Sequence, residues 1–217
     1  MPRMLDICCG ELGWALAFLA KGWECDGIDL RAPRRQPHEI PAGFEFIKAD
    51  ILTIDARWIR DGRYDFVCAS TPCEQFSLHG LKCFFNNPPY PELGIRLFNH
   101  VRQICEEAGV RYVMENVKAA RLFVGDAKHH AGPFWFWGNA VPPLMPQGIR
   151  KGTRMLPGNK RVKILAKGGD IKSHRNAHQR ELSPDGYAAA TARAATIPRE
   201  VSNAVADFAE GLLHIHS

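Results

Sequence analysis

The sequence predicts an α/β fold, a doubly wound parallel sheet with helices on both faces, and four stretches support this prediction. Residues 66–69 form a short apolar run without helical period, typical of a strand buried on both faces of a parallel sheet. Residues 3–22 combine a strand, a glycine turn and a helix, and residues 24–30 and 44–49 are further strands that end near aspartates. This alternation is typical of a Rossmann-like sheet.

Length and composition narrow the class of protein. A chain of 217 residues with 46% apolar content can build one domain of good size plus an appendage. Seven cysteines, an odd number without framework spacing, indicate reduced thiols. We find no apolar stretch of membrane-spanning length, no signal-peptide pattern and no convincing metal-ligand spacing. We therefore expect a soluble cytoplasmic monomer that binds neither a membrane nor a metal.

A basic segment divides the chain into regions. Residues 150–180 carry ten Lys or Arg against one acid, Asp170, which is +9 within an overall +5. A solvated loop would explain such a run of charges. The length of the run and its restriction to one segment favour binding to a polyanion such as nucleic acid. We predict a core domain at residues 1–141, a small basic insert at 142–182 and a returning C-terminal helix at 183–217. The predicted DNA contacts are Arg154, Lys160, Arg161, Lys163, Lys172, Arg175 and Arg180.

The first half of the chain predicts a cofactor site. A strand at residues 3–8 leads into a turn with Gly10 and Gly13, and a helix over 14–21 is ended by Gly22. Backbone N–H groups of such a turn can hold a cofactor at the sheet edge. Asp29 ends the second strand nineteen residues after Gly10, where an acid can bind ribose hydroxyls.

Two further strands bring candidate catalytic groups together. The strand over residues 66–69 breaks at Pro72, which delivers Cys73 beyond its carboxyl end, where ligands of such sheets bind. The alternative for Cys73 is a buried thiol acting as a small hydrophobe. A helix over residues 91–108 precedes a strand at 111–114, which places Glu115 and Asn116 at its carboxyl end. The apolar face of that helix is predicted to contain Leu93, Leu97, Val101, Ile104, Cys105 and Ala108.

The order of these motifs resembles the cytosine-C5 DNA methyltransferase family. The matching motifs are Asp6-x-x-x-Gly10-x-x-Gly13, Asp29, Asp50-Ile51, Pro72-Cys73-x-x-Phe76-Ser77 and Glu115-Asn116-Val117. The resemblance covers roughly residues 4–117 and, loosely, the last twenty residues. The chain looks like a small member of the kind that phages and prophages carry. The resemblance thus implies DNA methylation in a bacterial or phage-infected cell, as in restriction-modification.

The resemblance implies a role for each motif. S-adenosylmethionine would be the cofactor, with Gly10 and Gly13 against its methionine end, Asp29 on its ribose, and Asp50 with Ile51 on its adenine. Cys73 would attack C6 of a flipped-out cytosine, Glu115 would hold the N3 edge, and Asn116 would support the loop of Pro72 and Cys73. The same motifs add Asp6, Cys8, Leu12 and Leu30 to the cofactor site.

The chemistry of cytosine agrees with these implied roles. Adding a thiolate to C6 makes an enamine whose C5 can accept a methyl group, and loss of the C5 proton then expels the thiolate. Because C5 and C6 are out of reach of these groups inside a stacked duplex, the base has to be extruded from double-stranded DNA.

Alternative functions remain open from the sequence. Asn87-Pro-Pro-Tyr90 is a signature of methyltransferases that modify amino groups, but Pro72-Cys73 already occupies the place after the fourth strand. A DNA-binding module with a vestigial site would account for Cys8 and Leu12, which stand where the family has an aromatic residue and a glycine. RNA as substrate would use the same chemistry.

Two segments in the second half have a structural explanation as well as a functional one. Residues 132–138, Gly-Pro-Phe-Trp-Phe-Trp-Gly, replace the arginine-rich strand of the family. We expect these aromatic side chains to pack in the core rather than to form a surface on which bases stack. Thr196 and Pro198 begin a C-terminal helix with an apolar face of Val201, Ala204, Val205, Phe208 and Leu212.

Overall fold

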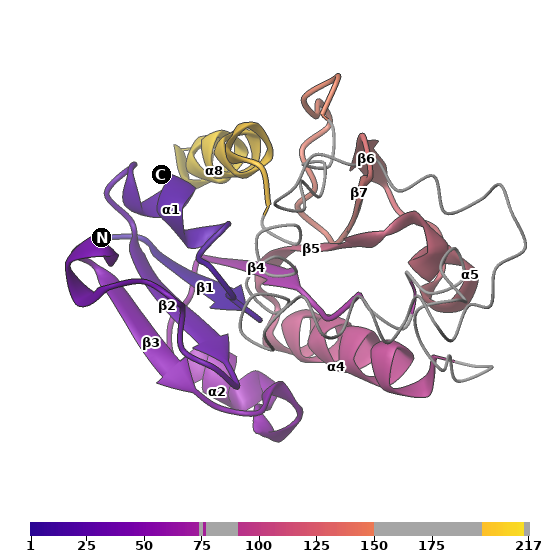
Figure 1. Cartoon of the computed structure of the whole chain (residues 1–217), viewed down its shortest axis with the longest axis horizontal. Helices are drawn as coiled ribbons and strands as arrows, with labels where there is room; N and C mark the ends of the chain where they lie inside the picture. Colours follow the sequence, from indigo (N-terminus) through magenta and orange to yellow (C-terminus); the bar gives the residue numbers. More distant parts are fainter. Residues whose placement is uncertain (74–75, 77–90, 150–196, 215–217) are drawn as a thin grey trace, which may run out of the picture.

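The computed structural model describes residues 1–73, 76, 91–149 and 197–214. Its seven strands form one sheet in the order β3-β2-β1-β4-β5-β7-β6 (Figure 1). The first five of these are parallel, and the hairpin of β6 and β7 is added antiparallel to β5. The strands are β1 (Arg3–Ile7), β2 (Glu24–Asp29), β3 (Phe44–Lys48), β4 (Phe66–Ser70), β5 (Arg111–Val117), β6 (His129–Ala131) and β7 (Phe134–Trp137).

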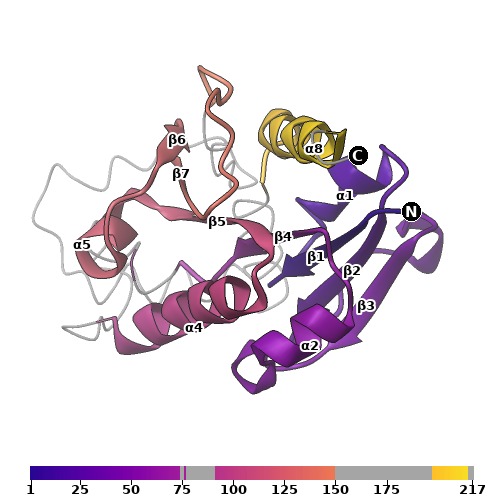
Figure 2. The same cartoon turned by 180° about the vertical axis from the view of Figure 1, so that it is seen from behind.

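Helices cover both faces of the sheet, which confirms the α/β doubly wound prediction. The short helix α1 (Ala15–Leu19) and the last helix α8 (Arg199–His214) lie together on one face, whereas α2 (Ala56–Asp61) and α4 (Glu92–Ala108) lie on the other (Figures 1 and 2). The sheet separates two hydrophobic cores, one built around Trp14, Phe18 and Phe136, the other around Phe98, Val101 and Met114.

The predicted strands β1 and β4 match the structure closely, and their residues are buried on both faces. All of β1 after Arg3 is buried, as are Phe66, Val67, Cys68 and Ala69 of β4. The helix predicted over residues 14–21 is shorter, with Ala15–Leu19 helical and turns continuing to Gly22, whose φ of +80° ends it. Short elements complete the described chain: η1 (Pro37–Glu39), η2 (Ile51–Thr53), η4 (Lys118–Ala120) and α5 (Arg121–Val124).

The buried face of α4 differs from the predicted one. Gly94, Phe98, Val101 and Cys105 form its centre, and Leu93 is 49% exposed. This face follows the helical spacing of i, i+4, i+7, i+11, so Leu93 and Leu97 lie at its margin. The prediction included Leu93 and Leu97 and left out Phe98, which is fully buried and packs edge-on against Trp137.

The fifth strand is longer than the predicted residues 111–114, and this corrects the position of two candidate residues. β5 runs to Val117, so Glu115 and Asn116 lie inside the strand. The extension arises because β7 pairs antiparallel with its second half, with Glu115 opposite Phe136 and Asn116 opposite Trp135. Glu115 is therefore paired on both sides, since β4 also pairs Ser70 with Glu115, whereas Asn116 is paired with β7.

The last helix closes the sheet face that α1 leaves half covered. Val201, Val205, Ala206 and Ala209 of α8 are buried in the core that also contains α1. Lys21, just after α1, bonds Asp207 at 2.6 Å and Glu210 at 2.9 Å, and these two hydrogen bonds raise the pKa of the lysine. The predicted amphipathic helix is present, and its predicted cap, Thr196, lies outside the described residues.

Candidate active site

The candidate site lies where the strand order reverses. β1 and β4 are neighbours, β2 and β3 continue to one side and β5 to the other. The chain therefore leaves β1 and β4 in different directions and opens a crevice at their carboxyl ends, where open α/β sheets bind ligands. The predicted cofactor turn follows β1, and Cys73 follows β4.

The predicted cofactor turn, residues 8–14, has an unusual backbone. Three of its residues have positive φ angles: Cys8 at 59°, Gly10 at 47° and Leu12 at 64°. Glycine adopts this region freely, whereas Cys8 and Leu12 are strained there. Leu12 is fully buried in the core beside α1, so packing of its side chain offsets the strain. The turn is fixed further by the Cys9 N–H, which donates to the Ile28 carbonyl at 3.1 Å.

Asp29 and Asp50 lie at neighbouring strand tips, as predicted. The Asp29 carboxylate accepts hydrogen bonds from the Gly10 N–H at 3.1 Å and the Arg31 N–H at 3.2 Å. The Ala49 N–H donates to the Asp29 carbonyl, which ties the end of β3 to that of β2. Asp50 caps η2 through the Leu52 N–H. These bonds bring the turn and both acids to one edge of the sheet.

The two apolar residues beside these acids differ in exposure. Leu30 is 61% exposed at the tip of β2, whereas Ile51 is buried in the core. Leu30 is therefore the apolar side chain of this pair that is free to contact a ligand. Gly13, the last residue of the turn, is half-buried and leads directly into α1.

Sequence reasoning missed a second contact on the turn. Arg35 donates from Nη2 to the Glu11 carbonyl at 3.2 Å, and the Glu11 carboxylate accepts from the Arg34 N–H at 3.4 Å. Residues 31–36 thus hold the turn from outside the sheet. A basic loop after a strand is common in sequences, so nothing in the chain marked Arg35 for this position.

Asp6 is a buried acid directly behind the turn. It is fully buried, and its Oδ2 accepts from the Ala15 N–H at 3.2 Å. Burial raises the pKa of Asp6 to about 8, with the charge of Asp29 adding to the rise and the N–H groups of Ala15 and Trp14 opposing it. Its Oδ1 has no hydrogen-bond partner among the described residues. A neutral carboxyl is the form that this environment favours.

The loop that carries Cys73 is held by Asn116. The Asn116 side-chain amide donates to the Thr71 carbonyl at 3.0 Å and to the Thr71 hydroxyl at 3.1 Å. Both residues are buried, so these bonds are shielded from water. The Asn116 side-chain oxygen is also used, because it accepts from the Val117 N–H at 2.8 Å. Thr71, which sequence reasoning passed over, is thus the link between Asn116 and the residues Pro72 and Cys73.

Glu115 lies on the opposite face of β5 from Asn116. It is 8% exposed and is paired with Ser70, the last residue of β4. The Ser70 hydroxyl accepts from the Trp14 indole N–H at 2.9 Å, which joins this strand end to the cofactor turn. The predicted catalytic residues therefore come from neighbouring strands: Pro72 and Cys73 follow β4, and Glu115 and Asn116 lie in β5 just before its last residue, Val117.

Cys73 differs from most other cysteines of the described residues. Cys9, Cys25, Cys68 and Cys105 are buried, and burial raises the pKa of each of these thiols. Cys73 and Cys8 are partly exposed. The buried-hydrophobe alternative therefore describes the first four cysteines but not Cys73.

The aromatic strand β7 is largely core, as expected. Phe134, Phe136 and Trp137 are buried, and Trp135 is half-buried. The Trp135 ring stacks on His130, with centroids 4.6 Å apart and planes at 19°. Trp135 is therefore the member of the strand with an exposed edge.

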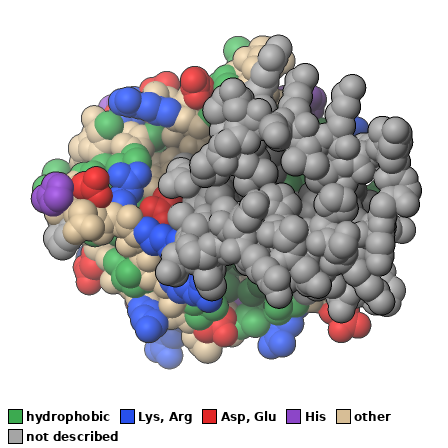
Figure 3. All heavy atoms as spheres, viewed as in Figure 1, with side chains coloured by type: hydrophobic (Ala, Val, Ile, Leu, Met, Phe, Trp, Pro, Cys, Tyr) green, Lys and Arg blue, Asp and Glu red, His purple; other side chains and the backbone are tan. Residues whose placement is uncertain are grey.

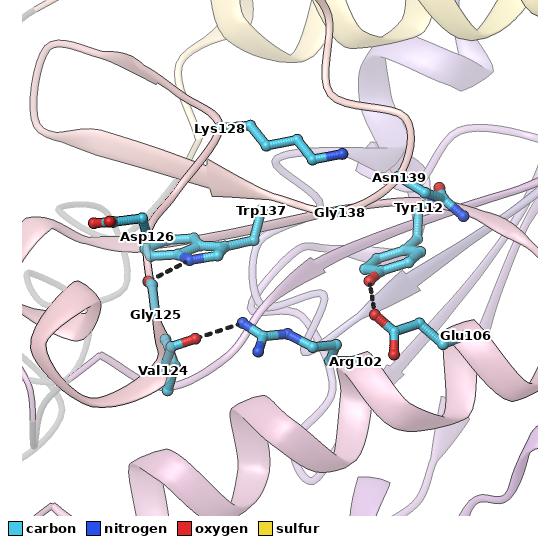
Figure 4. Close-up of a pocket in the computed structure, with 10 residues that line it drawn as sticks. All are labelled: Arg102, Glu106, Tyr112, Val124, Gly125, Asp126, Lys128, Trp137, Gly138 and Asn139. Carbon is cyan, nitrogen blue, oxygen red and sulfur yellow. Dashed lines mark hydrogen bonds between the residues drawn. The ribbon is translucent and has the colours of Figure 1, made fainter.

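A separate pocket lies away from these groups. It has a volume of about 380 Å³ between α4, the start of β5 and the end of β7, with Arg102, Tyr112, Lys128 and Trp137 among its lining residues (Figure 4). Most of its polar groups already pair with each other: Tyr112 donates to Glu106, Arg102 to the Val124 carbonyl, and Trp137 to the Gly125 carbonyl (Figure 4). None of its lining residues belongs to the predicted site.

Several predictions lie outside the described residues. These are the seven predicted DNA contacts between Arg154 and Arg180, the motif from Asn87 to Tyr90, and Ser77. On the described part of the face in Figure 3, Lys and Arg side chains alternate with Asp and Glu. No helix in the described part of the chain is long and apolar enough to cross a membrane. Within those same residues, no group of three or more His, Cys, Asp or Glu side chains is placed to hold a metal ion.

Comparison with known proteins identifies one family. The family model for the C-5 cytosine-specific DNA methylase matches residues 3–123 of this chain. No curated protein matches it.

Among solved structures, the similarities are partial. The Dnmt2 methyltransferase of S. pombe is 17% identical, with a TM-score of 0.40 over 55% of this chain and 36% of that one. A mutant of the DNMT2 protein of Spodoptera frugiperda is 21% identical, with a TM-score of 0.39 over 54% and 36%. The Bordetella bronchiseptica enzyme WbmH, solved with NAD⁺, is 20% identical, with a TM-score of 0.38 over 52% and 37%. The chain thus spans little more than a third of the length of these proteins.

Proposed function

Because the chain belongs to the C-5 cytosine-specific DNA methylase family, we propose that it transfers a methyl group from S-adenosylmethionine to C5 of a flipped-out cytosine in DNA, through a covalent adduct with Cys73. The observation that carries this proposal is the pair of hydrogen bonds from Asn116 to Thr71. They couple the strand that bears Glu115 to the loop that bears Cys73. A nucleophile and an acid on adjacent strand ends are what addition to a pyrimidine ring requires.

The residues of the turn fit the proposed cofactor. Asp29 is an acid at the tip of β2, and each of its oxygens accepts one backbone hydrogen bond and keeps a lone pair for a ribose hydroxyl. Gly10 has no atom nearer than 4.0 Å to the position of an added Cβ, so a ligand can approach its backbone. Leu30 offers an exposed apolar surface beside Asp29 for an adenine ring. When bound, S-adenosylmethionine supplies an electrophilic methyl group on a sulfonium.

The steps of the proposed reaction assign work to three side chains. The Cys73 thiolate adds to C6, and Glu115 in its protonated form donates to N3, which stabilises the charge that develops on the ring. The enamine carbon C5 would then form a bond to the methyl group, whose bond to the sulfonium breaks and leaves a neutral thioether. A base then removes the C5 proton, the double bond between C5 and C6 re-forms, and the thiolate leaves. Asn116 acts as a positioning residue, because it holds Thr71 and with it the cysteine loop.

The extruded base requires a surface for the rest of the DNA. We assign this role in part to the basic insert at residues 142–182, because its +9 charge between residues 150 and 180 is the largest of the chain. The remaining residues would form the catalytic domain, 1–141, and a returning segment, 183–217. A cytoplasmic location, where DNA and S-adenosylmethionine are both present, suits this reaction.

A trapping experiment tests the proposal. The protein is incubated with S-adenosylmethionine and a duplex that contains 5-fluorocytosine, and the products are separated on a denaturing gel. Because fluorine cannot leave C5, an active enzyme stays attached to the DNA. We expect a shifted protein band with the wild type and none with Cys73→Ser. An adduct that persists in Cys73→Ser, or its absence from every duplex tried in the wild type, would refute the mechanism.

A further inference from the structure

Two cations lie over a single aromatic ring at the edge of the candidate site. The Arg121 guanidinium carbon is 4.7 Å from the centre of the Trp135 ring, and the Lys118 Nζ is 5.8 Å from it. His130 stacks on the same ring. We call these four residues, Lys118, Arg121, His130 and Trp135, the Trp135 cluster. They come from η4, α5 and the hairpin of β6 and β7, which lie at one end of the sheet (Figure 1).

The register of the sheet places the Trp135 cluster beside the cysteine loop. Trp135 is directly opposite Asn116, so both side chains leave the sheet on the same face. The Asn116 amide bonds Thr71, two residues before Cys73. Lys118 follows the end of β5 directly. The cluster is therefore at the carboxyl end of β5, on the sheet face from which Asn116 holds the loop of Cys73.

The charge of the cluster is incompletely balanced. Arg121 bonds Asp126 through Nε and Nη2. Lys118 is exposed and has no acidic side chain within salt-bridge distance among the described residues. Lys128, His129 and His130 are exposed on the same hairpin and the residue before it. The cluster itself thus carries two cations and one histidine against a single acid, Asp126.

The aromatic ring makes these cations suitable for a rigid anionic partner. A free Lys or Arg side chain loses about 2 kcal/mol of rotamer entropy when it is fixed in a contact. Contact with the Trp135 face, worth about 0.5–1 kcal/mol at an exposed site, restricts both side chains before any ligand arrives. The cations are thus held at the site edge with donors still available. Duplex DNA presents one negative charge per about 1.7 Å of its axis, so two cations held together can bind neighbouring phosphates.

We propose that the Trp135 cluster is a docking surface for the phosphodiester backbone of duplex DNA beside the reacting base. The proposal rests on the proposed function in taking DNA as the partner, but it concerns described residues outside both the basic insert and the predicted catalytic and cofactor residues. It gives the core domain a DNA contact of its own.

The salt dependence of DNA binding tests this surface. Affinity for a labelled mixed-sequence duplex of about 20 base pairs is measured by fluorescence anisotropy between 50 and 200 mM salt. Each lost phosphate contact lowers the slope of log affinity against log salt by about 0.9, so the affinity of that variant falls about 3.5-fold less over this range. We expect this decrease in slope for Lys118→Gln, and about twice this decrease in slope for Lys118→Gln combined with Arg121→Gln.

Controls separate the surface from general charge and from folding. Arg57→Gln removes one exposed cation from α2, away from the hairpin, and should leave the slope unchanged (Figure 1). Lys118 makes no hydrogen bond to another described side chain, so Lys118→Gln should fold normally even if Arg121→Gln disturbs the contact with Asp126. Trp135→Leu keeps both charges and should lower affinity with the slope retained.

The outcomes distinguish the two proposals. A slope that is equal in the wild type and both cluster variants overturns the docking surface, while adduct formation by the same proteins still supports the proposed function. A changed slope together with no adduct in the trapping experiment supports the surface and refutes the proposed chemistry. A cluster-dependent slope with duplex RNA but not with duplex DNA overturns DNA as the partner.

Discussion

Replacing Asp6 by asparagine should make the folded protein more stable at neutral pH. The pKa of Asp6 rises from an ordinary 3.8 to about 8 on folding, mainly because burial disfavours the carboxylate. Between these pH values the folded state holds a proton that the unfolded state releases. The wild type therefore loses stability as the pH rises through this window, by about 1.4 kcal/mol per pH unit. Asparagine is neutral throughout, and its carbonyl can accept the Ala15 N–H in place of Oδ2.

The magnitude follows from the same shift. At pH 7 the penalty is about 4 kcal/mol, because this pH is about three units above the unfolded pKa. For a chain of this size, 1 kcal/mol corresponds to about 2–4 °C in Tm, so Asp6→Asn should melt about 8–16 °C above the wild type at pH 7. Near pH 4 the two proteins should melt at similar temperatures. Above pH 8 their difference should stop growing.

Unfolding by guanidinium and by heat at several pH values between 4 and 9 measures this difference. Subtracting the wild type from the variant cancels the other titrating groups, which both proteins share. A difference that stays constant across this range, or that favours the wild type at pH 7.5, would show that Asp6 is ionised in the folded protein, and the account of its burial would be wrong.

Three further substitutions give separate tests. Asn116→Ala leaves the Thr71 acceptors without their donor, so adduct formation with the 5-fluorocytosine duplex should slow about 100-fold, as for a misplaced nucleophile. Cofactor binding measured by calorimetry should stay unchanged, and weaker cofactor binding would contradict a role confined to the loop. Gly138→Ala places a Cβ 2.1 Å from the Tyr112 carbonyl oxygen at a φ of +130°, and should destabilise by about 3 kcal/mol or more in chemical denaturation; unchanged stability would mean that the end of β7 moves freely. Gly211→Ala on α8, where an added Cβ meets nothing within 4 Å, should stabilise by about 0.5–1 kcal/mol and serves as its matched control.

The elements that the sequence predicted well are those decided by local patterns. The apolar run of β4 and the strand, turn and helix from β1 to α1 were found because burial on both faces leaves a continuous signal. The acids at the ends of β2 and β3 were also found from a local pattern, because each stands at or just after the last residue of its strand. These patterns were enough to place Asp29, Asp50 and Cys73 at one sheet edge.

The features that the sequence missed depend on partners far along the chain. β5 extends through Glu115 and Asn116 because β7 pairs with it, and no local pattern contains that pairing. Arg35 reaches Glu11 across 24 residues, and Lys118 reaches Trp135 only after the hairpin has formed. The positive φ of Leu12 was also hidden, because leucine is normally a poor residue for that conformation. Its full burial shows why the position tolerates it.

The contact between α1 and α8 has a consequence for how the protein is made. Lys21 and Glu210 are 189 residues apart, and a ribosome adds about 5–20 residues per second, so about 10–40 s separate their synthesis. During that time the apolar face of α1 is without Val201, Val205 and Ala206, which later bury it. The nascent chain therefore presents an incomplete core beside the cofactor turn. The core on this face of the sheet should become complete only after the last helix has been translated.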